Sequence, residues 1–285
     1  MTAPFSRAVY KRQLAITLKN LRGTVTQQAA AEALGCTSGR IGHFERGRNV
    51  PTRADVERLA ELYRATDRAE ELATLTDQIR NAPRDGELIR LATIPSGFET
   101  YLALEQGARE VTEWAAMTIP GLLQTREYAT AVMRTHEAGL KRRELERRVE
   151  QRMRRQEVLR RSEDPPAINA IIDEAVLHRQ VGGVEVLRAQ LEHLVTVSSL
   201  PNVSVRALPY DRVVPAALHG PFTVMQFGIP GDDGVVYLED RTGGTAIEDP
   251  DSIDDYISVV DELLCTALTE EDSRTVFRRM GEKLQ

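Results

Sequence analysis

One stretch, TQQAAAEALGCTSGRIGHFERGRNVP (residues 26–51), places the strongest limits on the fold of this 285-residue chain. Thr26 is a helix-capping residue type, and the alanine-rich run after it reaches Gly35, which can close a helix in the left-handed conformation. Thr37 can begin a second helix, and Pro51 prevents that helix from continuing. The stretch therefore predicts two short helices joined by a tight turn.

The segments on both sides of this pair also have helical patterns. Upstream, apolar side chains recur at spacings of four, four and three, as one buried helix face requires: Tyr10, Leu14, Leu18 and Leu21. Downstream, Thr52 and Asp55 have the spacing of a capping box that opens a fourth helix, and a fifth is predicted from about Asp67 to Arg80. We therefore predict an all-α domain of five helices over residues 1–80.

The central pair also resembles a known family of DNA-binding domains. The residues that carry the resemblance stand where helices are capped, closed and packed: Thr26, Gln27, Gln28, Ala31, Leu34, Gly35, Thr37, Ile41, Phe44, Glu45, Gly47 and Pro51. This pattern resembles the XRE/Cro-type repressor domain, in which the second helix of the pair enters the major groove of double-stranded DNA. The resemblance implies a helix-turn-helix domain whose partner is double-stranded DNA.

The expected DNA contacts follow from that resemblance. Thr26 and Gln27, at the start of the first helix of the pair, are expected to lie on a phosphate. The second helix, from its cap onward, is expected to present an exposed face to base edges and flanking phosphates: Thr37, Ser38, Gly39, Arg40, Gly42 and His43. Arg40 and His43 are the long hydrogen-bond donors of this face, and Arg40 could bind guanine in bidentate fashion.

Three arginines beyond this helix are interpreted as phosphate contacts, with solvated surface charge as the alternative for each: Arg46, Arg48 and Arg53. Gly39 and Gly42 depart from the family pattern, because each costs roughly 1 kcal/mol of helix propensity relative to alanine. Either they let the backbone approach the groove closely, or the helix orders only on DNA. Glu45 is unsuited to phosphate, and we expect it to pair with a basic neighbour or with the following turn.

Charge is distributed unevenly along the chain. Residues 1–58 contain ten Lys and Arg against four Asp and Glu, a net charge of +6, which leaves −12 for residues 59–285 because the total is −6. This asymmetry is expected if only the N-terminal part contacts phosphate, and chance clustering of surface charge is the alternative. No apolar run approaches the roughly 20 residues that span a bilayer, so we expect a cytoplasmic protein with no membrane partner.

The domain boundary is predicted at residues 81–97, where two prolines and two glycines interrupt the helical periodicity. Residues 98–285 form the predicted second domain. Strands are predicted there at four positions: 167–173, 203–208, 222–227 and 235–239. Helices are predicted at three: 184–199, 252–267 and 270–282. This pattern favours an α+β domain whose small, mostly antiparallel or mixed sheet is flanked by helices.

Several short runs in this second domain recur, in the same order, in one family: residues 104–105, 119–125, 127–129, 152–156, 172–175, 182–183, 190–191, 208–209, 220–222, 237–239 and 267–273. They resemble the uncharacterised domain behind the helix-turn-helix in WhiJ-like regulators of filamentous, sporulating bacteria. The resemblance implies a role in development or secondary metabolism. It also implies a small partner protein encoded by a neighbouring gene, an arrangement likened to an antitoxin.

The sequence predicts no catalytic residue, metal or cofactor, and we expect that the protein is not an enzyme. His219 follows a strand as in phospholipase D-type sites, but Pro221 and Gln226 stand where a lysine and an aspartate would be needed. Asp173 and Glu174 are adjacent at a strand end and point to opposite faces, which favours capping or packing over an acid–base pair. The two cysteines have no metal-ligand spacing.

A strongly basic segment, residues 141–161, contains ten Lys and Arg against four Glu. A stripe at helical spacing predicts one packed side: Leu145, Val149, Met153, Gln156 and Leu159. Three interpretations remain for this segment: a solvated structural helix, a surface for a partner or a dimer, and an auxiliary DNA contact.

Two functional hypotheses follow. The first is a sequence-specific transcriptional regulator, a homodimer on a two-fold operator, whose second domain senses a partner protein or ligand or dimerises. The second is an antitoxin-like interaction protein that sequesters the product of a neighbouring gene and regulates its own expression through DNA. The sequence leaves open the operator, the direction of regulation, the effector and the dimer interface.

Overall fold

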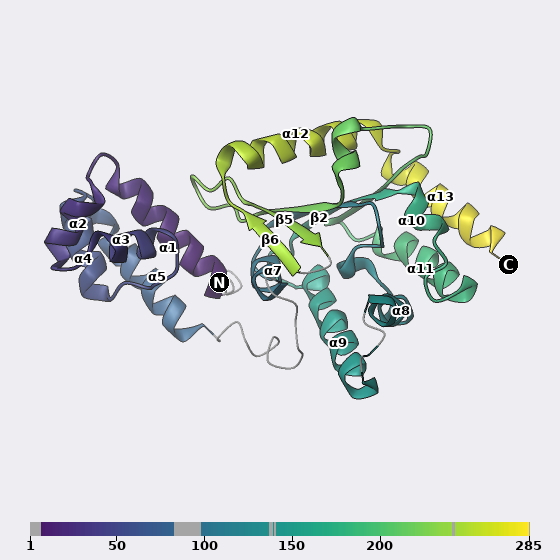
Figure 1. Cartoon of the computed structure of the whole chain (residues 1–285), viewed down its shortest axis with the longest axis horizontal. Helices are drawn as coiled ribbons and strands as arrows, with labels where there is room; N and C mark the ends of the chain where they lie inside the picture. The colour runs from purple at the N-terminus through teal and green to yellow at the C-terminus, as the bar shows by residue number, and fades with distance from the viewer. Residues whose placement is uncertain (1–6, 83–97, 137–138, 140, 241–242, 285) are drawn as a thin grey trace. The chain divides into compact units, whose positions relative to one another are not determined.

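The computed structural model describes residues 7–82, 98–136, 139, 141–240 and 243–284 (Figure 1). These residues form two compact units. The first contains the helices of residues 7–82 together with the segment Phe227–Asp232, and the second contains the other described residues. The expected linker, residues 81–97, lies outside the described residues from position 83 onward. No helix in the described ranges is long and apolar enough to cross a membrane.

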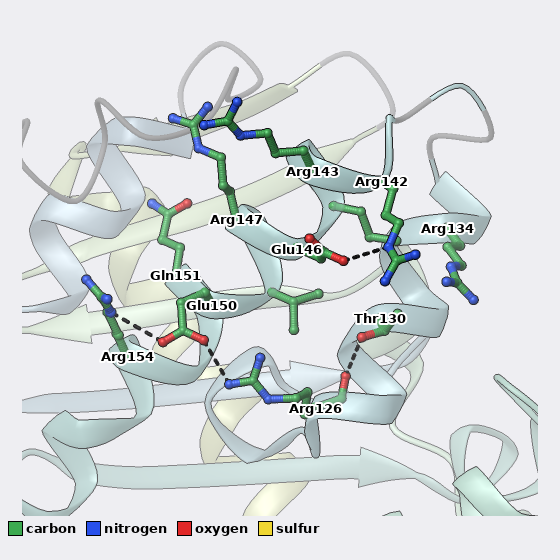
Figure 2. A pocket seen from close by; sticks show the side chains of 12 residues that line it. Arg126, Thr130, Arg134, Arg142, Arg143, Glu146, Arg147, Glu150, Gln151 and Arg154 are labelled. Atoms are coloured by element: carbon green, nitrogen blue, oxygen red, sulfur yellow. Dashed lines mark hydrogen bonds and ion pairs between the residues drawn. The ribbon is translucent and has the colours of Figure 1, made fainter.

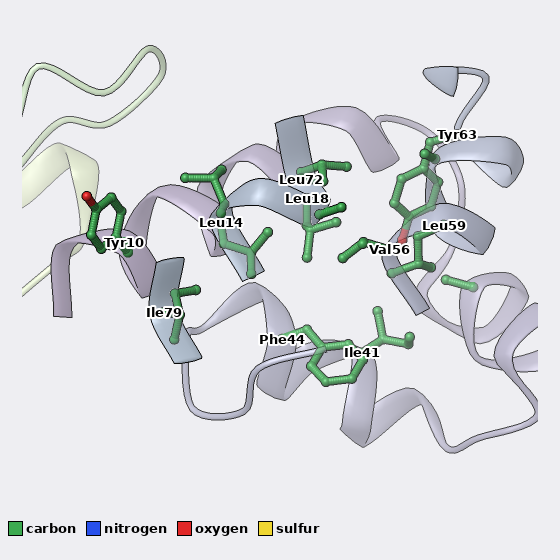
Figure 3. Close-up of a cluster of buried hydrophobic side chains, with 14 of the residues drawn as sticks. Tyr10, Leu14, Leu18, Ile41, Phe44, Val56, Leu59, Tyr63, Leu72 and Ile79 are labelled. Carbon is green, nitrogen blue, oxygen red and sulfur yellow. The ribbon is translucent and has the colours of Figure 1, made fainter. Parts of the chain in front are cut away.

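The first unit contains five α-helices, as predicted. They are α1 (Arg7–Arg22), α2 (Gln27–Leu34), α3 (Ser38–Glu45), α4 (Arg53–Leu62) and α5 (Ala69–Asn81), with a 3-10 turn, η1 (Thr66–Arg68), before α5. Their apolar faces meet in one core (Figure 3): Leu14, Leu18, Ala31, Ile41, Phe44, Val56, Leu59, Leu72 and Ile79. Each fully buried large aliphatic side chain contributes about 1.5–3 kcal/mol, so this shared core holds the short helices together.

Local capping fixes the helix ends near α2 and α3. Thr26 Oγ1 accepts a first-turn backbone N–H of α2 at 3.1 Å, and Gly35 closes that helix with φ of +62°. The predicted capping box of α4 is present, and the Asp55 carboxylate accepts the Thr52 backbone N–H at 2.8 Å. Thr37 occupies the N-cap position of α3, but its side chain makes no capping hydrogen bond, so the first amides of α3 lack that acceptor.

The second unit is built on one six-stranded mixed sheet, as the predicted fold class allows. The strands are β1 (Glu110–Ala115), β2 (Ala167–Asp173), β3 (Val203–Leu208), β4 (Phe222–Gln226), β5 (Val235–Asp240) and β6 (Gly243–Ile247). Their order across the sheet is β3-β2-β1-β4-β5-β6. The pairs β1–β2 and β2–β3 are parallel, and the pairs β1–β4, β4–β5 and β5–β6 are antiparallel.

Helices flank this sheet on both faces (Figure 1). The α-helices are α7 (Phe98–Glu105), α8 (Arg126–His136), α9 (Arg142–Arg155), α10 (Glu174–His178), α11 (Val184–Val197), α12 (Pro250–Thr266) and α13 (Glu270–Lys283). Three 3-10 turns join them: η2 (Gly121–Leu123), η3 (Gln156–Arg160) and η4 (Pro215–His219). On one face, Leu263 of α12 packs in a core with Trp114 and Val236 of the sheet. On the other, Tyr101 of α7 packs on Tyr237, with ring centroids 4.7 Å apart.

Two of the six strands, β1 and β6, were not predicted. Strand β1 has the sequence EVTEWA, in which two glutamates interrupt the apolar pattern of a central strand. Strand β6 has the sequence GGTAI and begins with two glycines, which have low strand propensity. Gly244 is required by packing, because a Cβ at that position would lie 1.7 Å from the Tyr237 hydroxyl oxygen.

A buried ion pair joins α7 and α9. Arg155 donates hydrogen bonds of 2.9 and 2.7 Å to Glu105, and these side chains are 6% and 2% exposed. Burial opposes the charge on Arg155, but the Glu105 carboxylate outweighs burial, so the pKa of Arg155 is raised. Burial, followed by repulsion from Glu105 and Glu239, raises the pKa of Glu113 on β1 to about 8. The predicted apolar stripe is partly confirmed, since three of its members are buried: Leu145, Val149 and Leu159.

Candidate nucleic-acid interface

The start of α2 has the geometry of an anion site. Thr26 satisfies one first-turn amide, whereas the backbone N–H groups of Gln27 and Gln28 have no acceptor within the helix. Thr26 and Gln28 are exposed, so solvent reaches this helix end. The free amides and the positive end of the helix dipole favour a phosphate oxygen at this point.

Glu45, the last residue of α3, ties α3 to α1 and α2. Its carboxylate accepts a hydrogen bond from the Gln27 side-chain amide at 2.7 Å and another from the Arg22 guanidinium. The hydrogen bond with Glu45 raises the pKa of Arg22. The expected pairing of Glu45 with a basic neighbour is therefore confirmed. The Glu45 carboxylate also binds the Gln27 side chain, so the backbone N–H of Gln27 is the group of this residue that can reach a phosphate.

Helix α3 exposes part of its predicted face. Solvent reaches five of the predicted positions: Thr37, Ser38, Gly39, Arg40 and His43. Gly42 is buried, which contradicts its expected place on the exposed face. The Arg46 guanidinium covers it, since a Cβ on Gly42 would lie 3.0 Å from Arg46 Nη2. This second glycine of α3 therefore makes room for an arginine of the same chain rather than for DNA.

Arg40 is held from two sides. Its Nη2 donates a hydrogen bond to Asp55 Oδ2 at 3.1 Å, and its guanidinium carbon lies 5.3 Å from the centroid of the Phe44 ring. Asp55 is itself fixed, because the same oxygen accepts the Thr52 N–H in the capping box. The Arg40 side chain remains 45% exposed, so donors are left for a further partner. An arginine ordered in this way suits bidentate hydrogen bonding to guanine.

The three arginines that follow α3 have different surroundings. Arg46 and Arg48 are exposed, and neither forms an ion pair with any residue that the structure describes. Arg53 lies among three carboxylates, at 2.6 to 3.6 Å: Glu57, Glu70 and Asp77. The hydrogen bond with Glu57 is the main cause of its raised pKa. These carboxylates repel a phosphate, so the surroundings of Arg53 oppose its predicted role.

Asp55 and Asn49 were not recognised as site residues in the sequence. Asn49 Nδ2 lies 3.5 Å from His43 Nδ1, and the His43 carbonyl accepts the Asn49 backbone N–H at 3.2 Å. Asp55 had a local signal, its spacing from Thr52, but that signal indicates a helix cap only. Its contact with Arg40 spans 15 positions and is decided by how α3 packs against α4.

Other candidate chemistry in the chain has structural explanations. Asp173 caps α10 by accepting the Ala175 N–H at 2.7 Å, and Glu174 accepts the Tyr210 N–H at 2.9 Å. His219 is exposed at the end of η4. Within the described residues, no group of His, Cys, Asp and Glu is arranged to hold a metal ion.

Comparisons with known proteins match two parts of the chain. Residues 13–74 match the model of a family described as a helix-turn-helix domain, which covers α2, α3 and their neighbours. Residues 98–279 match the model of a family described as a domain of unknown function (DUF5753). No curated protein and no solved structure matches the chain.

Proposed function

Because this chain belongs to the DUF5753 family and carries a helix-turn-helix domain N-terminal to its DUF5753 domain, we propose that it is a sequence-specific transcriptional regulator of the XRE type. The observation that carries the proposal is Arg40, exposed on α3 and ordered by Asp55 and Phe44. The start of α2, the other helix of the pair, carries backbone amides without an acceptor in the helix, as a module that reads a base and holds a phosphate requires.

In this proposal, one set of residues contacts the bases and another set contacts the phosphates. Arg40 hydrogen-bonds a guanine edge, and His43, Ser38 and Gly39 lie against neighbouring bases or sugar. The backbone at the start of α2, next to Thr26, holds one phosphate. The remaining phosphate contacts come from the start of α3 and from the two exposed arginines beyond it: Thr37, Arg46 and Arg48.

Selection of duplexes from a randomised library with the full-length protein tests this proposal. We expect one sequence family to be enriched, with a guanine whose preference disappears in Arg40→Ala. The Arg40→Ala variant should bind the selected duplex more weakly by about 1–3 kcal/mol, the usual value of a bidentate contact. Selection that enriches no sequence would contradict specific recognition, even if the protein binds DNA in low salt.

The second unit is proposed to control DNA binding by sensing a partner or ligand or by dimerising, as a WhiJ-like regulator would. An antitoxin-like function is the second candidate, because residues 98–279 make up most of the chain and form a domain large enough to bind a partner protein. Co-expression with the product of an adjacent short gene distinguishes the two. A stable complex that changes operator affinity supports the second, and two proteins that elute separately contradict it.

A further inference from the structure

A groove in the second unit lies between α8 and α9 and has a volume of about 760 Å³ (Figure 2). Six arginines line it: Arg126 and Arg134 from α8, and Arg142, Arg143, Arg147 and Arg154 from α9. Two carboxylates, Glu146 and Glu150, stand among them. The lining therefore carries a clear excess of positive charge in a chain whose net charge is −6.

The two glutamates neutralise only part of this lining. Glu146 accepts a hydrogen bond from Arg142 at 2.8 Å, and Glu150 pairs with Arg126 at 2.9 Å and with Arg154 at 3.4 Å. Two other arginines, Arg134 and Arg143, are exposed and form no ion pair with any described residue. The groove thus keeps cations that are free to bind an anionic partner.

A buried donor in the same groove also lacks a partner. Gln151 lines the groove, the residue is 8% exposed, and its Nε2 has no hydrogen-bond acceptor among the described residues. A buried donor without an acceptor is energetically unfavourable. If this amide rotates toward the groove, an incoming carboxylate or carbonyl oxygen would supply the missing acceptor.

We propose that this groove binds an acidic α-helical segment of another protein. Two packed helices leave a channel in which a third helix lies at the usual axial distance of about 8–10 Å. Carboxylates on such a helix would meet the free guanidinium groups in the bidentate geometry that arginine favours. A small ligand fits less well, because Arg142, Arg154 and Arg126 are 90%, 54% and 52% exposed, whereas small-ligand sites enclose most of their ligand.

Two other occupants fit the geometry less well. A DNA duplex carries its phosphates on a broad convex surface, which fits a groove between two packed helices less well than a single helix does. A second copy could offer α12, which carries five acidic residues and no basic one. However, α12 and the α8–α9 pair lie on opposite sides of the sheet (Figure 1). Such contacts would run head to tail and propagate instead of closing into a dimer.

The proposal is tested with the full-length protein and a labelled synthetic helix that has glutamates at every fourth position. Its matched control peptide has glutamine at those positions. We expect the acidic helix to bind at micromolar concentrations, and each of Arg134→Glu and Arg143→Glu to weaken it at least tenfold, or about 1.4 kcal/mol. Arg160→Glu is the matched control variant, because Arg160 is exposed in the same basic segment, outside the groove, and the charge change is identical.

Three outcomes would overturn the proposal. One is no binding of the acidic helix below about 1 mM, and another is equal binding of the glutamine peptide. The third is loss of duplex or single-stranded DNA binding in Arg134→Glu and Arg143→Glu, which would make the groove a nucleic-acid contact. Affinity for a duplex selected through α3 is measured in parallel and should stay unchanged in both variants. Failure of DNA recognition is thereby separated from failure of this inference.

Discussion

Arg40 and Arg53 are the same residue type near the same surface, and their carboxylate partners give them different roles. Arg40 meets one carboxylate and one aromatic ring, which order its side chain and leave donors exposed. Arg53 meets three carboxylates, which satisfy its charge within the protein. A cation can contribute to phosphate or base binding only to the extent that its own protein leaves it unneutralised.

Asp55→Asn tests whether Asp55 positions Arg40. The amide oxygen of asparagine can keep the capping hydrogen bond, but it no longer holds the guanidinium by charge. We expect discrimination at the guanine read by Arg40 to fall by about 1–3 kcal/mol, while affinity for random duplex rises because a negative charge is removed. Competition binding with selected and random duplexes measures both. Asp67→Asn, a remote and exposed site with the same charge change, should leave discrimination intact.

The phosphate contacts are tested by the salt dependence of DNA binding. Arg46→Ala and Arg48→Ala should each lower the slope of log affinity against log salt by about 0.9, the value for one phosphate contact. Arg53→Ala should leave this slope unchanged, because its guanidinium is neutralised by Glu57 and its neighbours. Titrations at several salt concentrations measure the slopes. A loss of slope in Arg53→Ala equal to that in Arg46→Ala would show that its carboxylates do not exclude phosphate.

At the scale of elements, α3 is short and contains two glycines with different surroundings. Gly42 faces Arg46, so its lack of a side chain is explained inside the protein. Gly39 is exposed, and the nearest atom to a Cβ there would be Thr37 Oγ1 at 3.9 Å. The free protein therefore leaves room for a side chain at position 39. Glycine at this position is explained by an external neighbour or by flexibility of the helix start.

Gly39→Ala separates these explanations. The change should stabilise the free protein by up to about 1 kcal/mol through helix propensity. If the backbone approaches DNA closely, duplex affinity should nevertheless fall, whereas it should rise if the helix orders only on DNA. Thermal unfolding and duplex titration measure the two effects. Gly35→Ala is the contrasting variant, because φ of +62° there should make alanine destabilising by about 1 kcal/mol.

The raised pKa of Glu113, which lies on β1 close to charged residues of α7 and α9, predicts that the free energy of unfolding depends on pH. Glu113 has a pKa of about 8 in the folded protein, above its ordinary value of 4.5, so folding favours its protonated form. The associated stability is fully present below about pH 4.5 and is lost as pH rises through 8. At roughly 1.4 kcal/mol per pH unit, the total loss is on the order of a few kcal/mol.

Glu113→Gln should therefore flatten the stability profile and make the variant more stable than the wild type at pH 9. Urea unfolding at intervals from pH 5 to about pH 9 provides the measurement. Glu192→Gln, at an exposed position of α11, is the control and should follow the wild-type profile. Parallel profiles for wild type and Glu113→Gln would mean that the carboxylate is solvated in the folded state.

At the scale of the whole molecule, the proposed function assigns base recognition to one short helix, α3. A single helix-turn-helix domain makes few base contacts, so it rarely distinguishes its operator from other DNA by itself. Two modules on a two-fold site double the contact, and their spacing then follows from DNA geometry. Charge supports this division of roles, since the net +6 of residues 1–58 contrasts with −12 in residues 59–285.

Duplexes with two selected half-sites test the homodimer. Affinity should be highest when inverted half-sites have centres about 34–36 Å apart, one helical turn. An insertion of half a turn, about five base pairs, should rotate one half-site away and weaken binding sharply. Gel-shift titration over a series of spacings measures this. Equal affinity at every spacing, or for an isolated half-site, would indicate that the protein binds as a monomer.

Local signals in the sequence determined the positions of the helices in the first unit and the α+β class of the second. Thr26, Gly35 and the pair Thr52–Asp55 act on backbone groups within four positions, so their effects can be predicted without knowing the fold. The mixed sheet was only partly predictable, because the charges of β1 and the glycines of β6 hide their strand character until neighbouring strands pair with them.

Tertiary structure alone decided which charges have partners from distant parts of the chain. Whether Arg40 meets Asp55, whether Arg53 meets Glu70, and whether Arg155 is buried against Glu105 depends on helix packing across 15 to 50 positions. The same packing buried Gly42 and left Arg134 and Arg143 exposed beside a groove. The sequence by itself determined where the chain is helical and where it is positively charged. Whether each charge is neutralised or free was decided by distance in space, which short-range capping and periodicity do not encode.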